Sequence, residues 1–243
     1  MIQSAKNEKI KYLKKQKDNK FLLFLDNAKT IREAITAGFG LQELLISHTN
    51  EKLQEEFNKY NPTLTTDAVI TALSDTKTPQ GIIAVFSMPK HEFISPKTNF
   101  LVLDTVQDAG NVGTLLRTAK GTGFNTVILI DSAHISNPKT IRSSMGAIFD
   151  LKIYEMKKAE FMAIAKDIQL PLLTADMNGE NVFKADLPNE FGLVLGNEGQ
   201  GVSKELRELC TKTISIPMQN NLESLNVGVA GGVIMFETIR RKL

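Results

Sequence analysis

The chain has 243 residues, 42% of them hydrophobic and 23% charged, with a formal net charge of only +2. This describes one large or two modest globular domains, with no apolar run near the ~18 residues of a membrane span and no secretory signal at the lysine-rich start. The single cysteine, Cys210, excludes an internal disulfide and a cysteine metal cluster, so we expect a cytoplasmic protein.

Residues 1–20 carry an unusual local charge. Seven lysines stand there against Glu8 and Asp18, which leaves an excess of five positive charges. Such a segment, which we expect to be helical, can follow a phosphate backbone and make binding depend on salt. It can equally be a solvated helix face without a ligand, and the cluster alone does not decide between the two.

The first half of the chain, to about Met88, alternates short apolar runs with amphipathic segments. The pattern predicts strands at 21–25, 43–47 and 81–86 and helices at 28–37, 51–60 and 67–73. It therefore predicts a small α/β domain over residues 1–89. Residues 90–98 show no periodicity, and we interpret them as a linker.

Residues 99–243 alternate more strictly. We expect strands at 100–104, 126–131, 152–155, 170–175, 191–196 and 213–217, and helices at 112–121, 138–148, 158–168, 203–210 and 225–241. The strands are nearly continuous apolar runs, which favours a parallel sheet with helices on both faces. Ligands of such sheets bind beyond the carboxyl ends of the strands, so we expect the chemistry in the loops after Leu103, Leu195 and Ile216.

The first of these loops leads into a helix that contains Asn111, Gly113 and Arg117. Asn111 is a good N-cap. Gly113 precedes Arg117 by four residues on the same helix face, and its missing side chain would leave space above the arginine for a ligand. The same residues would also suit a capped helix with one surface arginine.

The second loop, Gly196-Asn-Glu-Gly-Gln-Gly201, places three glycines between a strand and a helix that Ser203 would cap. Glycines there let a ligand approach the backbone, and we interpret the segment as a binding loop. It lacks the Gly-Lys-Ser/Thr end of a P-loop and the spacing of a dinucleotide fingerprint. The third loop, 216–226, precedes a helix whose small residues from Gly228 to Gly232 permit close packing.

In this order, the three loops resemble the motifs of the SpoU/TrmH family of RNA ribose methyltransferases, in the SPOUT superfamily. The first is similar to N-x-G-x-x-x-R-T-A, the second to L-G-x-E-x-x-G, and the third to I-P-M…S-L-N. Residues 137–147 also resemble the family, and residues 78–81 (Thr-Pro-Gln-Gly) look like the end of a small substrate-binding domain. The sequence departs from the family pattern at Ala109, Asp26-Asn27 and Asn220, none of which we assign to chemistry.

The resemblance implies a fold and a reaction. The fold is α/β, with a small N-terminal RNA-binding domain and a C-terminal SPOUT domain over 99–243. Its parallel sheet carries a deep trefoil knot, which no sequence pattern would reveal. The reaction is methylation of a ribose 2'-hydroxyl by S-adenosylmethionine in a homodimer, on ribosomal RNA first and transfer RNA second. No metal and no membrane partner are implied.

The resemblance also implies site residues. The catalytic set is Arg117, Asn111, Glu198 and Asn226, and the cofactor-binding set is Leu195, Gly196, Asn197, Gly199, Ile216, Met218, Ser224 and Leu225. Arg117 would act on the 2'-hydroxyl. Because the pKa of arginine lies above ~12, we favour binding of the neighbouring phosphate and stabilisation of the forming oxyanion over proton abstraction.

Two other classes of protein compete with this interpretation. A non-catalytic RNA-binding protein with a degenerate fold would need losses at the motif positions, which are all present. A dinucleotide-dependent oxidoreductase would need the missing glycine fingerprint. The sequence identifies neither the RNA nor the modified nucleotide.

Overall fold

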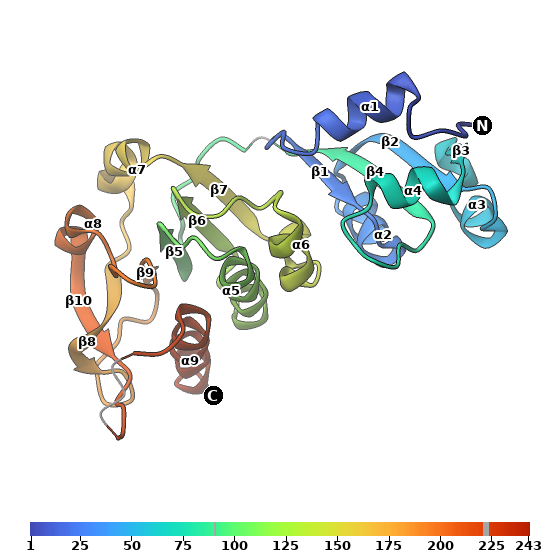
Figure 1. Cartoon of the computed structure of the whole chain (residues 1–243). Coiled ribbons are helices and arrows are strands. Elements are labelled where there is room, and N and C mark those ends of the chain that lie inside the picture. Colours follow the sequence, from blue (N-terminus) through green and yellow to red (C-terminus); the bar gives the residue numbers. More distant parts are fainter. Residues whose placement is uncertain (90, 221–223) are drawn as a thin grey trace. The chain divides into compact units, whose positions relative to one another are not determined.

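The computed structural model describes residues 1–89, 91–220 and 224–243 and divides into two compact units, Met1–Lys90 and His91–Leu243. Each unit has its own sheet (Figure 1). Each also has its own cluster of buried hydrophobic residues. Lys90 of the predicted linker and Asn221, Leu222 and Glu223 of the third predicted loop lie outside the described residues.

The N-terminal unit contains a four-stranded sheet in the order β1-β4-β2-β3. The strands are β1 (Leu22–Leu25), β2 (Gly40–Ser47), β3 (Thr63–Thr65) and β4 (Ile82–Ser87). The helices are α1 (Glu8–Lys15), α2 (Ala28–Thr36), α3 (Glu51–Phe57) and α4 (Asp67–Leu73), with a 3-10 turn at Asn58–Tyr60. The predicted α/β pattern is confirmed, and only the three-residue β3, which pairs in parallel with β2, was not predicted.

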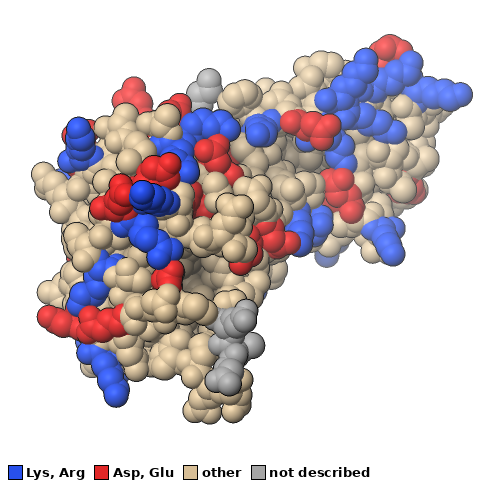
Figure 2. Space-filling view, turned by 60° about the vertical axis from the view of Figure 1, so that its left-hand side comes forward, with Lys and Arg blue, Asp and Glu red and all other residues tan. Residues whose placement is uncertain are grey.

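Helix α1 belongs to the core of this unit. Its Ile10 and Leu13 are buried with residues of α4, β2 and β4. Three of the seven lysines in the segment form ion pairs, Lys9 with Glu43, Lys11 with Glu8 and Lys17 with Asp75. Within the described chain the other four form none: Lys6, Lys14, Lys15 and Lys20. Figure 2 shows basic side chains gathered over the upper part of this unit.

The C-terminal unit contains a six-stranded sheet in the order β10-β8-β9-β5-β6-β7, and every neighbouring pair is parallel. The predicted parallel sheet is therefore confirmed. The strands are β5 (Phe100–Asp104), β6 (Thr126–Ile130), β7 (Lys152–Met156), β8 (Leu172–Asn181), β9 (Gly192–Leu195) and β10 (Cys210–Ser215). The knotted path of the C-terminal segment stays a prediction.

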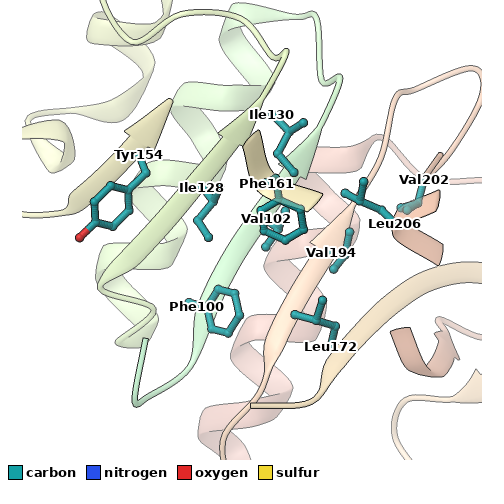
Figure 3. Packing of buried hydrophobic residues seen from close by; sticks show 10 residues of the cluster. All are labelled: Phe100, Val102, Ile128, Ile130, Tyr154, Phe161, Leu172, Val194, Val202 and Leu206. Atoms are coloured by element: carbon teal, nitrogen blue, oxygen red, sulfur yellow. The ribbon is translucent and has the colours of Figure 1, made fainter. Parts of the chain in front are cut away.

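Helices cover both faces of this sheet, as predicted. They are α5 (Ala109–Thr122), α6 (Pro138–Ser144), α7 (Lys158–Ile164), α8 (Lys204–Leu209) and α9 (Val227–Arg240), with 3-10 turns at Ala147–Phe149 and Ala165–Asp167. On one face, Phe161 of α7 and Leu206 of α8 pack on side chains such as Val102 and Val194 (Figure 3). On the other, α5 and α9 meet the sheet around Leu195.

Helix α6 is shorter than predicted because Met145 takes a left-handed conformation, with φ 49°, and Gly146 follows with φ 86°. Strand β8 is longer than predicted because its pairing with β10 resumes after an irregularity between Thr213 and Ile214.

The second half of the predicted linker packs on the C-terminal unit. The rings of Phe93 and Tyr154 lie 5.1 Å apart, the Ile94 N–H donates to the Tyr154 hydroxyl, and the Ser95 hydroxyl donates to the Asp167 carbonyl. Across the part of the chain that the structure describes, no helix is both long and apolar enough to cross a membrane.

Candidate active site

The three predicted loops all follow strands of the parallel sheet at its carboxyl edge. Strands β5 and β9 are neighbours, with Leu103 paired to Leu195, so the first and second loops adjoin. Strand β8 lies between β9 and β10, so its end separates the second loop from the third. The sheet order therefore brings together segments that lie far apart in the sequence.

The first loop enters α5 earlier than predicted. The helix begins at Ala109, and its N-cap is Asp108, whose carboxylate accepts from the Asn111 N–H at 2.8 Å and pairs with Lys139 at 2.6 Å. The prediction that Asn111 is the cap is wrong. Because Asn111 sits in the first turn instead, its side chain is available for other contacts.

Glu198, Asn111 and Asn226 form a continuous run of hydrogen bonds, which we call the carboxamide chain. Asn111 Nδ2 donates to Glu198 Oε1 at 3.0 Å, and Asn226 Nδ2 donates to Asn111 Oδ1 at 2.9 Å. Asn226 also caps α9, because its Oδ1 accepts from the Gly228 N–H at 2.9 Å. One residue from each predicted loop is thus fixed relative to the other two.

The Glu198 carboxylate accepts the hydrogen bond at one end of this arrangement. Burial would raise its pKa, but the hydrogen bond from Asn111 and backbone N–H groups, including those of Gln107 and Asp108, hold the pKa below the ordinary glutamate value. A carboxylate held by several donors is a weak base. Glu198 is therefore better suited to fixing the geometry of the site than to accepting a proton.

The second loop folds back on itself. The Asn197 N–H donates to the Gly201 carbonyl at 3.0 Å, and the Gly201 N–H donates to the Asn197 carbonyl at 2.9 Å. A Cβ at Gly196 would lie 2.1 Å from the Gly201 carbonyl carbon, so this glycine is required for the loop to close. Gly199 is exposed and has room around it.

Arg117 lies apart from the carboxamide chain. Its side chain is exposed and makes no hydrogen bond or ion pair with any residue in the described ranges. At about 100° per residue, the six steps from Asn111 to Arg117 amount to one full turn of the helix plus about 240°, so the two side chains leave α5 in different directions. Three of the four predicted catalytic residues are therefore brought together within one chain, and Arg117 is not.

Gly113 does not leave space for a ligand above Arg117. A Cβ there would lie 2.6 Å from both the Ser143 Cβ and the Thr140 carbonyl oxygen of α6. The expectation of a ligand space is wrong, because this glycine is where α5 and α6 touch.

The third loop supplies apolar side chains and a closely packed helix. Ile216, Met218 and Leu225 are half-buried and Ser224 is exposed. The predicted close packing of α9 is confirmed, since a Cβ at Gly231 would lie 2.4 Å from Leu115 of α5.

Three polar residues beside the loops were either not assigned to the site or assigned the wrong contact. Thr174 of β8 lies opposite Val194 of β9 and Thr213 of β10, and among the described residues its buried hydroxyl has no partner. The Ser203 N–H donates to the buried Asp104 carboxylate at 2.7 Å. Ser203 does precede α8, but its hydroxyl forms no cap hydrogen bond. The prediction rested on the motif loops. A polar residue after an apolar run would have indicated these positions at the strand ends.

Within the described ranges, no group of three or more His, Cys, Asp or Glu side chains could hold a metal ion.

Comparison with known proteins gives matches over nearly the whole chain. The model of the SpoU rRNA Methylase family matches residues 98–236, and that of the MRM3-like substrate binding domain matches residues 7–84. The 23S rRNA (guanosine(2553)-2'-O)-methyltransferase RlmP of Bacillus subtilis (strain 168) is 29% identical over 97% of both chains. The 23S rRNA (adenosine(1067)-2'-O)-methyltransferase of Streptomyces azureus is 33% identical over 63% of this chain and 58% of its own.

Two solved structures share the fold. The AdoMet-bound rRNA methyltransferase from Sinorhizobium meliloti has a TM-score of 0.87 and 23% identity, with 100% of this chain and 98% of that chain covered. The SpoU methyltransferase AviRb from Streptomyces viridochromogenes, in complex with AdoMet, has a TM-score of 0.86 and 24% identity, with 98% of each chain covered. At these identities the likeness establishes the fold.

Proposed function

This chain belongs to the SpoU rRNA methylase family, and from that premise we propose that it methylates a ribose 2'-hydroxyl of ribosomal RNA, with S-adenosylmethionine as methyl donor. The observation that carries the proposal is the carboxamide chain. It joins one residue of each motif loop through hydrogen bonds of 2.9 and 3.0 Å at the carboxyl edge of the sheet. We propose that the protein works in the cytoplasm on RNA of the ribosome.

The residues around the second and third loops suit an adenosine group. The half-buried Ile216, Met218 and Leu225 provide apolar walls, and Gly199 leaves the backbone open. The Thr174 hydroxyl, between the two loops, has no partner within the described part of the chain. We propose that these residues, with Leu195, Gly196 and Ser224, hold the cofactor.

The bound cofactor would supply a methyl group already activated by its positive sulfur. The protein then has to align this methyl with the ribose oxygen, and alignment can contribute up to about 7–11 kcal/mol. The carboxamide chain suits this task because its polar groups are fixed before the substrate arrives. Asn111 and Asn226 would orient the ribose, and Glu198 would keep Asn111 in place.

Arg117 is the group we assign to the RNA. An arginine guanidinium can bind a phosphate with two parallel hydrogen bonds. The same charge stabilises the ribose oxygen as negative charge develops on it. Exposure of Arg117 supports this role, since a side chain that must meet a large substrate has to be accessible.

We also propose a homodimer through α9. Val229 and Phe236 on its outer face are 52% and 57% exposed, and Gly232 and the half-buried Val233 lie between them at helical spacing. An apolar stripe of this kind is typical of a surface that another protein covers. It adjoins α5, where Arg117 lies, so a second copy would come close to this arginine.

Complementation tests the dimer and the origin of Arg117 together. Arg117→Ala and Asn226→Ala should each be inactive alone. If Arg117 of one copy serves the site of the other, a mixture of the two variants regains activity, because one site per mixed dimer is intact. A mixture that stays inactive while dimers exchange would place Arg117 in the site of its own copy.

The dimer surface has its own test. Phe236→Glu should give monomers in light scattering.

The N-terminal unit would select the RNA. Its match to a substrate-binding domain supports this role, and the four lysines without ion pairs in the described chain could contact phosphates.

The direct test is methyl transfer from labelled S-adenosylmethionine to ribosomal RNA from cells that lack the gene, followed by mapping of the modified nucleotide. We expect one 2'-O-methylated ribose in ribosomal RNA. Label found only in transfer RNA would establish the second substrate class instead. Absence of label in both RNAs, with no cofactor binding in calorimetry, would refute the proposal.

A further inference from the structure

Both polar atoms of the Asn197 side chain form hydrogen bonds within the protein. Its Nδ2 donates to the Thr105 carbonyl at 3.0 Å. Its Oδ1 accepts from the N–H groups of Gly199 at 2.9 Å and Gln200 at 3.1 Å. The side chain thus closes its own loop and also ties that loop to the segment that follows β5. This use leaves little of it for a bound cofactor.

The backbone of Thr105, whose carbonyl accepts this hydrogen bond, has an unusual conformation. Thr105 has φ 57°, a left-handed conformation that a β-branched residue rarely adopts. Its carbonyl accepts from Gln107 Nε2 as well as from Asn197, and Gln107 also donates to the Asp131 carbonyl after β6. Strained backbone persists where the surroundings hold it, and such positions gather at functional sites.

Asn197 directly precedes Glu198, whose Oε1 receives the hydrogen bond from Asn111. The tip of the loop, from Glu198 to Gly201, is exposed, so no burial of the tip fixes the direction of the Glu198 side chain. The contacts that fix it are those at Asn197 and those of the carboxylate itself. Release of Asn197 from Thr105 would therefore free the loop to turn Glu198 away from α5.

We propose that Asn197 is a positioning residue for methyl transfer: by clamping the glycine loop to the Thr105 carbonyl, it holds the Glu198 carboxylate against Asn111. This inference rests on the proposed function for its kinetic consequence, but the geometry it describes exists in the folded protein without substrate. It differs from the expectation that Asn197 contacts the cofactor.

The first test does not depend on activity. The Glu198 carboxyl is titrated by NMR in full-length protein with 13C-labelled glutamate, in the wild type, Asn197→Ala and Gln200→Ala. Gln200 is the matched control because its exposed side chain makes no hydrogen bond with the described residues. We expect a pKa below the ordinary glutamate value in the wild type and in Gln200→Ala, and a pKa closer to the ordinary value in Asn197→Ala, which removes the clamp without adding a charge. An unchanged pKa in correctly folded Asn197→Ala would overturn the proposal.

The second test separates positioning from cofactor binding. Asn197→Ala should lower kcat by about 100-fold, the size expected for a misplaced group, while the cofactor Kd changes less than about threefold. In a Glu198→Ala background, which removes the acceptor of the Asn111 hydrogen bond, the same substitution should have little further effect on kcat, because its route of action is already broken.

Two kinetic results would overturn the proposal. One is a large rise in cofactor Kd with kcat unchanged at saturation, which would make Asn197 a cofactor contact. The other is a full additional loss of kcat in the Glu198→Ala background. A wild-type enzyme without methyl transfer would refute the proposed function instead, and the NMR titration would still decide the role of Asn197.

Discussion

Helix α5 carries two side chains that we assign to the active site, and their surroundings are opposite. Asn111 is bound on both sides, to Glu198 and to Asn226, before any ligand arrives. Arg117, less than two turns further on, is exposed and makes no hydrogen bond within the described chain. The difference separates two tasks. In the proposed mechanism, the groups that shape the site are fixed by the fold, whereas the group that we assign to the RNA is left accessible.

Replacement of Arg117 by alanine should give the largest effect. We expect kcat to fall by about 10³-fold or more, roughly 4 kcal/mol of barrier, because a charge aimed at the reacting oxygen is lost. Thermal stability and cofactor affinity should stay as in the wild type, since no residue in the described part of the chain bonds to the side chain. Lys120→Ala, on the same helix, is the control. Near wild-type turnover in Arg117→Ala would remove this residue from the mechanism.

Asn111→Ala should damage both activity and stability, unlike Arg117→Ala. We expect a loss of about 100-fold in kcat. The free energy of unfolding should fall by about 1–2 kcal/mol, because Glu198 and Asn226 each lose a hydrogen-bond partner. Chemical denaturation and steady-state kinetics measure the two effects. If stability were unaffected, the bound and the accessible side chain would not differ in the way proposed.

Two glycines of α5 extend the comparison to packing. Gly113→Ala should destabilise the fold by about 2 kcal/mol, because the new methyl group would press on Thr140 and Ser143. Gly121→Ala should instead stabilise it by about 0.5–1 kcal/mol, since nothing lies within 4 Å of the added Cβ and alanine favours helix. Equal effects of the two substitutions would contradict the close contact of α5 with α6.

The lysines near the N-terminus also divide into ion-paired and accessible side chains. We expect their replacement to have the smallest effect. Replacement of Lys6, Lys14, Lys15 and Lys20 by glutamine should reduce the salt dependence of RNA binding, by up to about 3 in the slope of log K against log salt. The matched variant replaces the ion-paired Lys9, Lys11 and Lys17 and should change the slope less. Deletion of residues 1–20 is unsuitable, because it removes the buried Ile10 and Leu13. Equal slopes in all three proteins would make these lysines a solvated face.

The sequence predicted the elements well because apolar runs and helix periodicity are local signals. It did not predict which residue caps α5. Aspartate and asparagine are equally good caps, so local preference cannot choose between Asp108 and Asn111. The choice depends on where β5 releases the chain, which pairing with β6 and β9 decides.

The contact of Gly113 with α6 also could not be predicted from the sequence. A glycine with space around it and a glycine against a neighbouring helix look alike in sequence, and only the position of α6 distinguishes them. The carboxamide chain was predicted as a set of residues, through the family motifs. Its connectivity depends on strands β5 and β9 lying side by side, although they are far apart in the sequence.

The position of α9 late in the sequence determines when the carboxamide chain can form during synthesis. Asn226, which caps α9, completes the carboxamide chain. Arg241, just beyond α9, donates to the carbonyls of Val182 and Ala185. A protein is synthesised from its N-terminus, so both contacts form only after all six strands of the parallel sheet have been made. The N-terminal unit can fold while synthesis continues, whereas the carboxamide chain is completed only when α9 is available.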